Sequence, residues 1–355
     1  MNRTIAIVHN AVQEPSLPDD QDVLVQVAAV SQALDQLGYQ SRSIPCTLDL
    51  ETLKQSLTRL SPWLVFNLVE SLDGHGRLIH LVPGLLEALD MAYTGCPAQA
   101  IYATSHKVMA KERLRAAGLP TADWINPMPL DFPWTGGIGN HGIKIGKVQA
   151  KEPKALKNPG PSRTWIIKSL WEHASLGLEP ENLVTGTFEE VATLLEARAE
   201  ALGGACFAEH YIHGREFNLS LLGTETGVRV LPPAEILFQG LDPAQPKVVG
   251  YRAKWMPDAV EYHNTPRSFE FPAQDQALLT HLEALARDCW QVFGLRGYAR
   301  VDFRVDDQNN PFILEINTNP CISPDAGFAA ALDRAGISFD QGVEQILGQG
   351  FNPFI

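Results

Sequence analysis

The sequence predicts a fold of mixed α/β and α+β type, in which an open parallel α/β layer comes first. Residues 4–8 form a short β-rich run, and apolar residues recur at helical spacing over residues 23–37. A further strand is expected over residues 63–68 and a further helix over residues 81–89. Alternation of strand and helix favours a parallel sheet covered by helices. After residue 107 the strands and helices follow one another without this regular order, as in α+β domains.

The elements expected further along the chain are of several kinds. Gly and Pro are frequent between residues 122 and 160, so this stretch is expected to be a domain boundary or a loop that orders on binding. Short helices are expected after residue 317. Apolar periodicity and turn signals predict helices over 107–117, 189–202 and 275–293, a strand over 165–168, a hairpin over 207–222 that turns at His213-Gly214, and a hairpin over 297–317.

Composition limits the function. The 355-residue chain has a formal net charge of −13, which disfavours nucleic-acid binding because a phosphate backbone needs a basic surface. The five cysteines are scattered and include no CxxC pair, which disfavours a disulfide framework and a zinc site. The sequence contains neither a signal peptide nor an apolar run of membrane-spanning length. We therefore expect a cytoplasmic protein that has no membrane partner.

The strongest chemical signal is the last predicted hairpin. A turn centred at residues 308–309 places Asp302 opposite Glu315 and Arg300 opposite Asn317. Side chains alternate along a strand, so these four project from one face. The opposite, core-facing set is expected to be Val301, Phe303, Val305, Phe312, Leu314 and Ile316. Opposed carboxylates repel each other unless a cation joins them, and two carboxylates with an amide suit Mg²⁺. The spacing alone is equally compatible with a solvated polar face.

Several segments in one order point to a known family. The hairpin supplies Arg300-Val301-Asp302 and the run from Leu314 to Pro320. Collinear with it are Tyr93-Thr94-Gly95, Ser105-His106-Lys107, Ile166-Ile167-Lys168, the run from Glu172 to Gly177, the run from Phe207 to Phe217, Glu235-Ile236, and Tyr251 with Ala253-Lys254. Together these segments resemble the ATP-grasp ligases related to D-alanine–D-alanine ligase. The resemblance covers roughly residues 60–322, and its motifs are specific as a set.

The resemblance implies an ATP-grasp fold and an ATP-dependent carboxylate–amine ligase that works through an acyl phosphate. The N-terminal α/β substrate domain would span residues 1–100, and the central domain with the Gly/Pro/Lys-rich loop would span residues 101–205. The C-terminal domain with the metal hairpin would span residues 206–355. The implied substrates are small amino acids or peptides, and a homodimer is expected by analogy.

The family also implies roles for individual residues. ATP and Mg²⁺ are the implied cofactors, with Mn²⁺ as an alternative ion. The implied nucleotide-binding set is Lys107, Lys168, Glu172, Glu209, Ile212, Glu216 and Lys254. Within it the first two lysines would hold phosphates, Glu209 would meet the adenine, and Glu216 would accept the ribose hydroxyls. The implied metal ligands are Asp302, Glu315 and Asn317, and the implied catalytic residues are Arg300, Lys254 and Ser175.

The chain departs from the family at positions that would contact substrates. The glycine-rich N-terminal signature is absent, and Glu14 is only a distant candidate for its glutamate. Glu70 stands at the place of a histidine, Trp255 at the place of a tyrosine, and the serine expected after Pro320 is missing. The favoured hypothesis is therefore retained ligase chemistry with substrates other than two D-alanines. The Gly/Pro/Lys-rich loop over 127–160 is equally compatible with a lid and with a solvated loop that has no role.

Other interpretations stay open. A true D-alanine–D-alanine ligase is the main rival, and Glu70, Asp73 or His75 could bind an amine or simply cap loops. A non-catalytic ATP sensor or scaffold would be expected to lose residues such as Arg300 or the metal ligands, which are all present. A carboxylating enzyme of the same superfamily would need more domains than this length offers. Cys321, next to the hairpin, lacks a neighbouring base that would make it a nucleophile.

Overall fold

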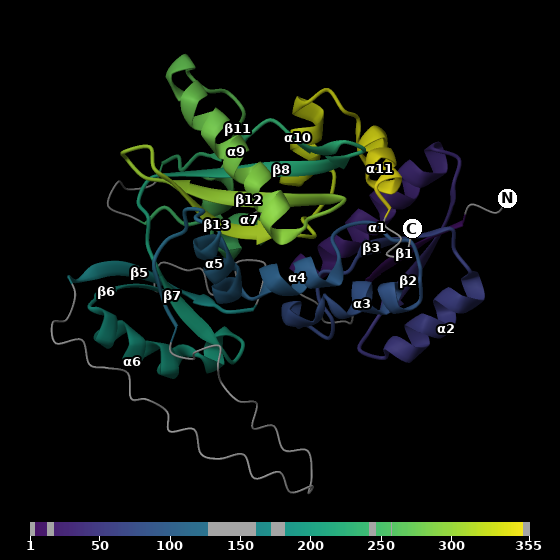
Figure 1. Ribbon diagram of the computed structural model, residues 1–355, viewed down its shortest axis with the longest axis horizontal. Helices are drawn as coiled ribbons and strands as arrows, with labels where there is room; N and C mark the ends of the chain where they lie inside the picture. Colours follow the sequence, from purple (N-terminus) through teal and green to yellow (C-terminus); the bar gives the residue numbers. More distant parts are fainter. Residues whose placement is uncertain are drawn as a thin grey trace, which may run out of the picture.

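The computed structural model describes residues 4–12, 18–126, 161–171, 182–240, 246–256 and 258–350 (Figure 1). Three sheets organise these residues. A parallel sheet built from the N-terminal segment lies at one end of the molecule, a four-stranded sheet lies at the other end, and a six-stranded sheet lies between and above them in this view.

The N-terminal sheet has the predicted parallel α/β design. Its central strand β1 (Thr4–Asn10) is buried along its whole length and pairs in parallel with β2 (Gln40–Cys46) and β3 (Leu64–Leu68). Helices α1 (Pro18–Gln36) and α2 (Leu50–Leu60) connect these strands. We did not predict β2, because it is a polar edge strand whose residues are mostly exposed.

The following helices carry the chain from this sheet to the rest of the molecule. They are α3 (Leu81–Ala88), α4 (Ala98–Ser105) and α5 (Lys107–Ala116). His106 caps α5 by accepting a hydrogen bond from the backbone N–H of Met109, and the next residue, Lys107, begins the helix. The cap therefore fixes the place at which the first predicted nucleotide lysine leaves the backbone.

The four-stranded sheet has the order β4 (Trp124–Ile125), β7 (Cys206–His210), β5 (Arg163–Ser169), β6 (Leu183–Gly186), and all its pairs are antiparallel. Helix α6 (Phe188–Arg198) covers one face and buries Val191 and Leu195 against it. A capping box formed by Thr187 and Glu190 starts this helix. The opposite face of the sheet is left to face the six-stranded sheet.

The six-stranded sheet contains the predicted hairpin over residues 297–317. Five of its strands lie in the order β11 (Arg267–Ser268), β10 (Ala234–Ile236), β8 (Arg215–Thr224), β12 (Tyr298–Val305), β13 (Pro311–Asn317). The sixth strand, β9 (Gly227–Val230), also pairs with β8. Helix α9 (Gln276–Phe293) packs its apolar stripe on one face of this sheet. The short helices α7 (Tyr251–Trp255) and α8 (Val260–His263) follow β10 in sequence.

The last helices join the six-stranded sheet to the N-terminal sheet. Helices α10 (Gly327–Arg334) and α11 (Phe339–Gly348) share a core with α1. In this core Ile5 and Val30 from the N-terminal part lie with Tyr298 and Leu347 from the C-terminal part. Two segments that are far apart in sequence are therefore fixed against each other, which builds one wall of a cavity described below.

The predicted hairpin over residues 207–222 is wrong. Its two strands exist as β7 and β8, but they belong to different sheets, and residues 211–214 cross from one sheet to the other. Strand β7 already lies between β4 and β5, and β8 already lies between β10 and β12. A strand–turn–strand pattern in the sequence does not reveal that both edges of each strand are taken by other partners.

The predicted core face of the last hairpin is wrong at two positions. A β-bulge between Asp302 and Phe303 shifts the register by one residue, so that Phe303 opposes Ile313. Ile313 is therefore fully buried in the core, whereas Leu314 lines a pocket and Phe312 is only partly buried. A bulge leaves no clear mark in a pattern of alternating residues.

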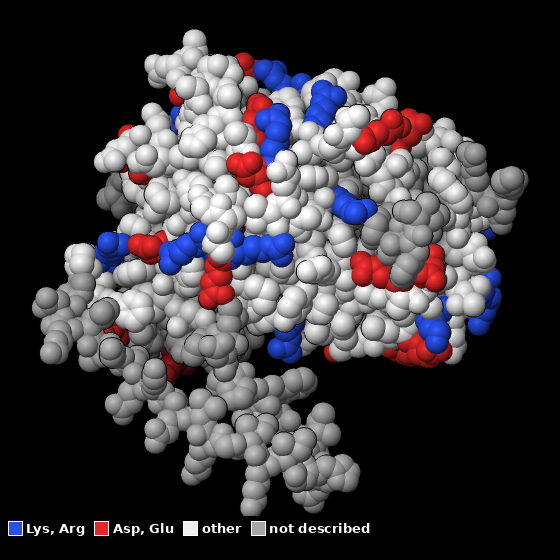
Figure 2. Space-filling model, in the orientation of Figure 1, with Lys and Arg blue, Asp and Glu red and all other residues white. Residues whose placement is uncertain are grey.

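Within the described residues, no helix combines the length and the apolar character that crossing a bilayer would require. Basic and acidic side chains of the described residues lie interspersed over the face shown in Figure 2.

Candidate active site

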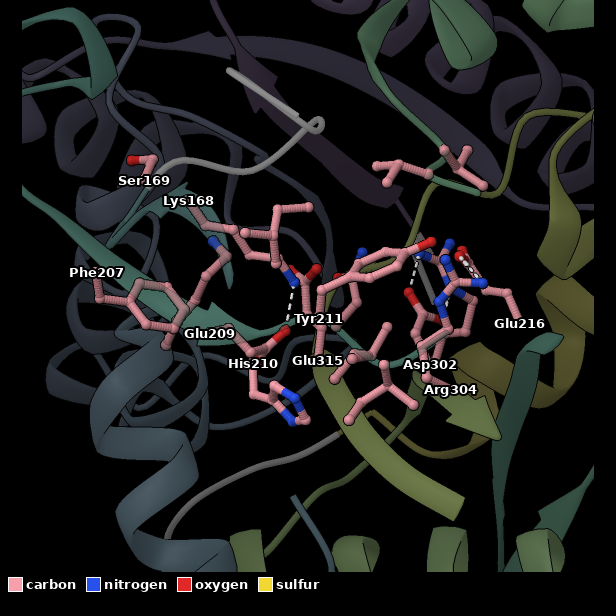
Figure 3. A pocket seen from close by; sticks show the side chains of 18 of the residues that line it. Lys168, Ser169, Phe207, Glu209, His210, Tyr211, Glu216, Asp302, Arg304 and Glu315 are labelled. Carbon is pink, nitrogen blue, oxygen red and sulfur yellow. Dashed lines mark hydrogen bonds and ion pairs between the residues drawn. The ribbon is translucent and has the colours of Figure 1, made fainter. Parts of the chain in front are cut away.

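The candidate site lies in a pocket between the four-stranded and the six-stranded sheets (Figure 3). Strands β5 and β7 supply one wall, and β12 and β13 supply the facing wall. The pocket brings together most of the residues predicted from sequence: Lys107, Lys168, Glu209, Ile212, Glu216, Lys254, Arg300, Asp302, Glu315 and Asn317. Residues separated by more than 200 positions in sequence thus meet at one place.

Two lysines and a buried glutamate form a charged network at the β5–β7 side. Lys168 lies 2.7 Å from one oxygen of Glu209, and Lys111 lies 2.5 Å from the other. Lys111 and Glu209 are almost completely buried, and Lys111 also donates to Thr121 and to the carbonyl of Ala122. Burial alone would raise the pKa of Glu209, but Lys111 and then Lys168 outweigh burial and lower it. Glu209 is therefore held ionised between two cations.

Lys107 enters the same pocket from the start of α5, and its backbone N–H donates to the carbonyl of Leu170 at the end of β5. With Lys168 it places two ammonium groups in the pocket, a suitable arrangement for adjacent phosphates. We missed Lys111 in the sequence, although it lies one helical turn after Lys107 on the same helix. Its role became clear only from its contact with Glu209.

Glu216 also lines the pocket. The lining further includes the apolar side chains of Ile212, Val248 and Leu314. Burial raises the pKa of Glu216, and the guanidinium of Arg304, 3.7 Å away, is the group that opposes this most. We missed Arg304 as well, although it follows Asp302 by two residues and so projects from the same strand face.

The predicted register of the last hairpin is confirmed for the four residues of its polar face. Arg300 opposes Asn317, and Asp302 opposes Glu315. Arg300 donates to both oxygens of Asp302, at 2.7 and 2.8 Å, and the Asn218 amide donates to one of them at 2.8 Å. Burial alone would lower the pKa of Arg300, but Asp302, two residues further along the same strand, raises it. Arg300 is therefore a fixed positive charge at the rim of the pocket.

The donors on this hairpin fit a hard divalent cation. Within the parts of the chain that the structure describes, no group of three or more His, Cys, Asp or Glu gathers in a way that could hold a metal ion. The predicted set is instead two carboxylates, Asp302 and Glu315, with the amide of Asn317 nearby on β13. An all-oxygen set of this size suits Mg²⁺ when the remaining ligands come from phosphates and water.

A second, larger cavity of about 780 Å³ adjoins the pocket and extends to the N-terminal sheet. Lys254, Arg300, Asp302 and Asn317 line both spaces, so they stand where the two meet. The surrounding protein lowers the pKa of Lys254, and Arg300 lowers it further, while Glu315 and Asp302 oppose this. A group transferred from the pocket into the cavity would pass these residues.

The cavity has an acidic end next to the N-terminal sheet. Asp22 accepts hydrogen bonds from the Cys321 thiol and the Ser323 hydroxyl, both at 2.9 Å. Glu70 accepts a hydrogen bond from Gln26 at 2.7 Å. Burial raises the pKa of Cys321, and Glu70 and Asp22 raise it further, so the thiol stays protonated and is a poor nucleophile.

The cavity has a basic residue at another edge. Arg267, on β11, donates to the backbone carbonyl of Asp325 at 3.2 Å and lies beside Gly327 at the start of α10. Part of the Arg267 side chain is exposed, but the surrounding protein partly removes it from water, and this desolvation, followed by the charge of Arg300, lowers its pKa. The cavity therefore offers carboxylates on one side and a guanidinium on another.

Some predicted residues lie outside the described part of the chain. They are Glu14, Glu172, Ser175 and the loop over 127–160. Their predicted roles stay predictions. We missed Asp22 and Arg267, which lie outside the recognised motifs in sequence. We also missed Asn218, which directly follows the run from Phe207 to Phe217 but pairs with Asp302 only in the folded chain.

The chain is similar to D-alanine–D-alanine ligases over most of its length. Residues 166–348 match the family model described as D-ala D-ala ligase C-terminus. A D-alanine–D-alanine ligase of Moorella thermoacetica is 30% identical over 330 residues, covering 92% of this chain and 93% of that protein. One of Synechococcus sp. is 29% identical over 327 residues, covering 91% and 87%.

Solved structures of D-alanine–D-alanine ligases share the fold. The Bacillus anthracis enzyme complexed with ATP has a TM-score of 0.68 at 19% identity, over 98% of this chain and 97% of that chain. The D-alanyl-alanine synthetase A of Vibrio cholerae has a TM-score of 0.69 at 14% identity, over 99% of both chains. Because the family model matches more than half of the residues of this chain, the chain belongs to the D-alanine–D-alanine ligase family of ATP-grasp enzymes and is an ATP-dependent carbon–nitrogen ligase.

Proposed function

We propose that this ligase joins two amino acids through an acyl phosphate, with D-alanine as the substrate at both positions. The observation that carries the proposal is the junction of the pocket and the cavity, where Lys254 and Arg300 stand beside the Asp302–Glu315 pair. The similarity to D-alanine–D-alanine ligases supports D-alanine, and this reverses the preference for other substrates that the sequence motifs suggested.

In the first half-reaction a substrate carboxylate oxygen attacks the γ-phosphorus of ATP, and ADP leaves. Lys107 and Lys168 would hold the phosphates, and Lys254 would stand beside the transferring group. When nucleotide phosphate replaces Glu209 as the partner of Lys168, Lys111 still neutralises Glu209. The buried glutamate therefore need not be left without a cation during turnover.

Asp302, Glu315 and Asn317 would hold Mg²⁺, which supplies charge neutralisation for the phosphates when it is bound. Asn218 and Arg300 fix Asp302 from the protein side. Because these contacts orient the carboxylate in advance, little reorganisation is needed when the phosphates arrive.

In the second half-reaction the amine of the other amino acid attacks the acyl carbon, and phosphate leaves. Arg300 would stabilise the oxyanion that forms, since it lies on the cavity side of the hairpin and is held by both oxygens of Asp302. The ammonium of the attacking amino acid must first release one proton to the solvent to become a nucleophilic amine. It loses a second proton as the amide forms, and the departing phosphate is a sufficient acceptor for this one. The reaction thus converts ATP and two amino acids into ADP, phosphate and a dipeptide.

Charges in the cavity suit two zwitterions. The acidic end at Asp22 and Glu70 would attract the ammonium of the amino acid that is activated, and Arg267 would attract the carboxylate of the amino acid that attacks. Glu70 and Trp255 nevertheless differ from the family pattern, and both line the cavity. They favour the second candidate function, which is the same chemistry on a different amino acid.

The test is phosphate release from Mg·ATP in the presence of D-alanine, L-amino acids, dipeptides and small carboxylic acids, alone and in pairs, with mass spectrometry of the products. D-alanine alone should give D-alanyl-D-alanine with one ADP and one phosphate per dipeptide. If only a different pair of compounds gave a product, that pair would replace D-alanine as the proposed substrates. Tight Mg·ATP binding without turnover in the whole screen would contradict ligation and favour a nucleotide sensor.

A further inference from the structure

Arg304 is a buried cation in the nucleotide pocket that none of the proposed chemical steps uses. It lies on β12, two residues after Asp302, and only 4% of its surface is exposed. On the neighbouring strand β8 the residue directly opposite is Glu216, and the two side chains lie 3.7 Å apart in an ion pair. Figure 3 shows them side by side in the pocket.

The protein holds the Arg304 guanidinium from several directions. One terminal nitrogen donates to the carbonyl of Gly214 at 3.2 Å, and the other donates to the carbonyl of Lys247. The guanidinium carbon also lies 5.8 Å from the centre of the Tyr211 ring and 5.4 Å from that of Phe238. Two carbonyls and two rings leave this side chain little freedom.

The Tyr211 hydroxyl strengthens the same arrangement. It accepts a hydrogen bond from the backbone N–H of Lys247 at 2.9 Å. The segment at Lys247 is therefore attached both to Tyr211 and to Arg304, and the next residues, Val248 and Val249, line the pocket. A rigid guanidinium next to Glu216 thus has a fixed place in the pocket wall.

We propose that Arg304 is a positioning residue that holds Glu216 in the orientation in which its carboxylate accepts the ribose hydroxyls of the nucleotide. The inference rests on the proposed use of this pocket for ATP. A carboxylate that is paired on one side with a fixed guanidinium presents its remaining lone pairs in one direction. A glutamate without that partner would sample several rotamers, and burial would favour its protonated form.

The experiment measures the Kd of Mg·ADP and of Mg·2′,3′-dideoxy-ADP by calorimetry for the wild-type chain and for Arg304→Met, Arg304→Lys and Glu216→Gln. In the wild-type chain we expect the dideoxy nucleotide to bind about tenfold more weakly, the loss expected for charge-assisted hydrogen bonds. In Arg304→Met the Kd of ADP should rise about tenfold, while the Kd of the dideoxy nucleotide changes little. The ratio of the dideoxy-nucleotide Kd to the ADP Kd should therefore approach one. Glu216→Gln should behave in the same way.

Two further variants make the result decisive. Arg304→Lys keeps a charge near Glu216 but cannot reach both carbonyls, so its ratio should lie between those of the wild type and Arg304→Met; it also serves if the methionine variant does not fold. In the double variant Arg304→Met/Glu216→Gln the loss should not exceed that of either single variant. Arg229→Met, an exposed arginine on β9 of the same sheet, is the matched control and should bind as the wild type does.

The failures can be told apart. Equal weakening of both nucleotides in a folded Arg304 variant would show a general disturbance and overturn the inference, as would a wild-type ratio near one. Either result would leave the ligase proposal standing. A wild-type chain that binds neither nucleotide would overturn both.

Discussion

Glu209 is the residue whose position departs most from its expected role. The family resemblance predicts a contact with adenine, and in the structure both carboxylate oxygens already face lysines, Lys111 and Lys168. A buried ion pair often stabilises a fold no more than apolar packing would, but removing one partner leaves a buried charge without a counter-charge, which is strongly destabilising. The consequence is a strong dependence of folding on a residue that belongs to the active site.

Glu209→Gln should lower the free energy of unfolding by about 3 kcal/mol, because Lys111 is almost fully buried and would lose its counter-charge. Denaturant titration followed by circular dichroism measures this. The control Glu51→Gln removes an exposed carboxylate from an i,i+3 pair with Lys54, and no measurable change is expected there. Equal stability of the Glu209 variant and the wild type would contradict a buried charge network.

The same network should make stability depend on pH in a defined direction. Burial by itself would raise the pKa of Glu209, but Lys111 and Lys168 together lower it from its ordinary value of 4.5. A carboxyl whose pKa is lower in the folded chain stabilises it fully above about pH 4.5, and the contribution is lost as the pH falls through the folded value. The stability difference between wild type and Glu209→Gln should therefore shrink on acidification, and a constant difference down to about pH 3 would argue against this assignment.

At the scale of elements, the crossing between β7 and β8 depends on Gly214. Its φ is +142°, and an added Cβ would lie 2.0 Å from the carbonyl oxygen of Val305. Gly214→Ala should therefore either prevent folding or lower the free energy of unfolding by more than about 3 kcal/mol. Gly227 has a similar φ of +147° with no atom within 4 Å of the added Cβ, so Gly227→Ala should cost only the backbone strain. Thermal melts of both variants separate the cost of the contact with Val305 from the cost of backbone strain. An equal loss of stability in the two variants would mean that the contact with Val305 relaxes.

The β12–β13 hairpin carries the proposed metal ligands, so its chemistry and its folding can be separated. Glu315→Gln keeps the shape of the side chain, and the unfolding free energy should change by no more than about 1 kcal/mol. Turnover at saturating Mg²⁺ should fall about 100-fold or more, because a ligand is lost rather than a supporting contact. Asp307→Asn, at the exposed turn of the same hairpin, should leave both quantities unchanged. Full activity of Glu315→Gln across a Mg²⁺ titration would remove Glu315 from the metal site.

Individual residues show which parts of this picture a sequence can predict. The opposition of Asp302 and Glu315 followed from turn position and alternation, because both are local properties of a hairpin. The bulge that turns Leu314 into the pocket did not follow, since it depends on packing against neighbouring strands. Arg304 was within reach of the alternation argument, but its partners at Gly214 and Lys247 come from segments 57 or more residues away.

At the scale of the whole molecule, the proposed substrate cavity exists because the N-terminal sheet and the C-terminal helices are packed together. Asp22 on α1 and Cys321 after β13 are 299 positions apart, yet the thiol lies 2.9 Å from the carboxylate. The core shared by α1, α10 and α11 fixes this meeting. The parallel α/β layer was predictable from sequence, but the wall that it contributes to the cavity was not, because no local pattern records which distant surface covers which.

The proposed division of the cavity gives a prediction about substrates. Arg267 lines the cavity beside α10 and carries a guanidinium that can pair with a carboxylate, so it should bind the carboxylate of the attacking amino acid. Arg267→Met should raise the KM for that amino acid about tenfold at saturating ATP, and should leave the Kd of Mg·ADP unchanged because the nucleotide lies in the adjoining pocket. Arg334→Met, which removes an exposed ion pair with Glu270 on the surface of the same region, is the control and should alter neither quantity. Initial rates at varied concentrations of the amino acid, with calorimetry for the nucleotide, measure the two effects. An unchanged KM would place the carboxylate elsewhere, and a rise in both constants would mean that Arg267 supports the closed arrangement of the whole site instead of one substrate.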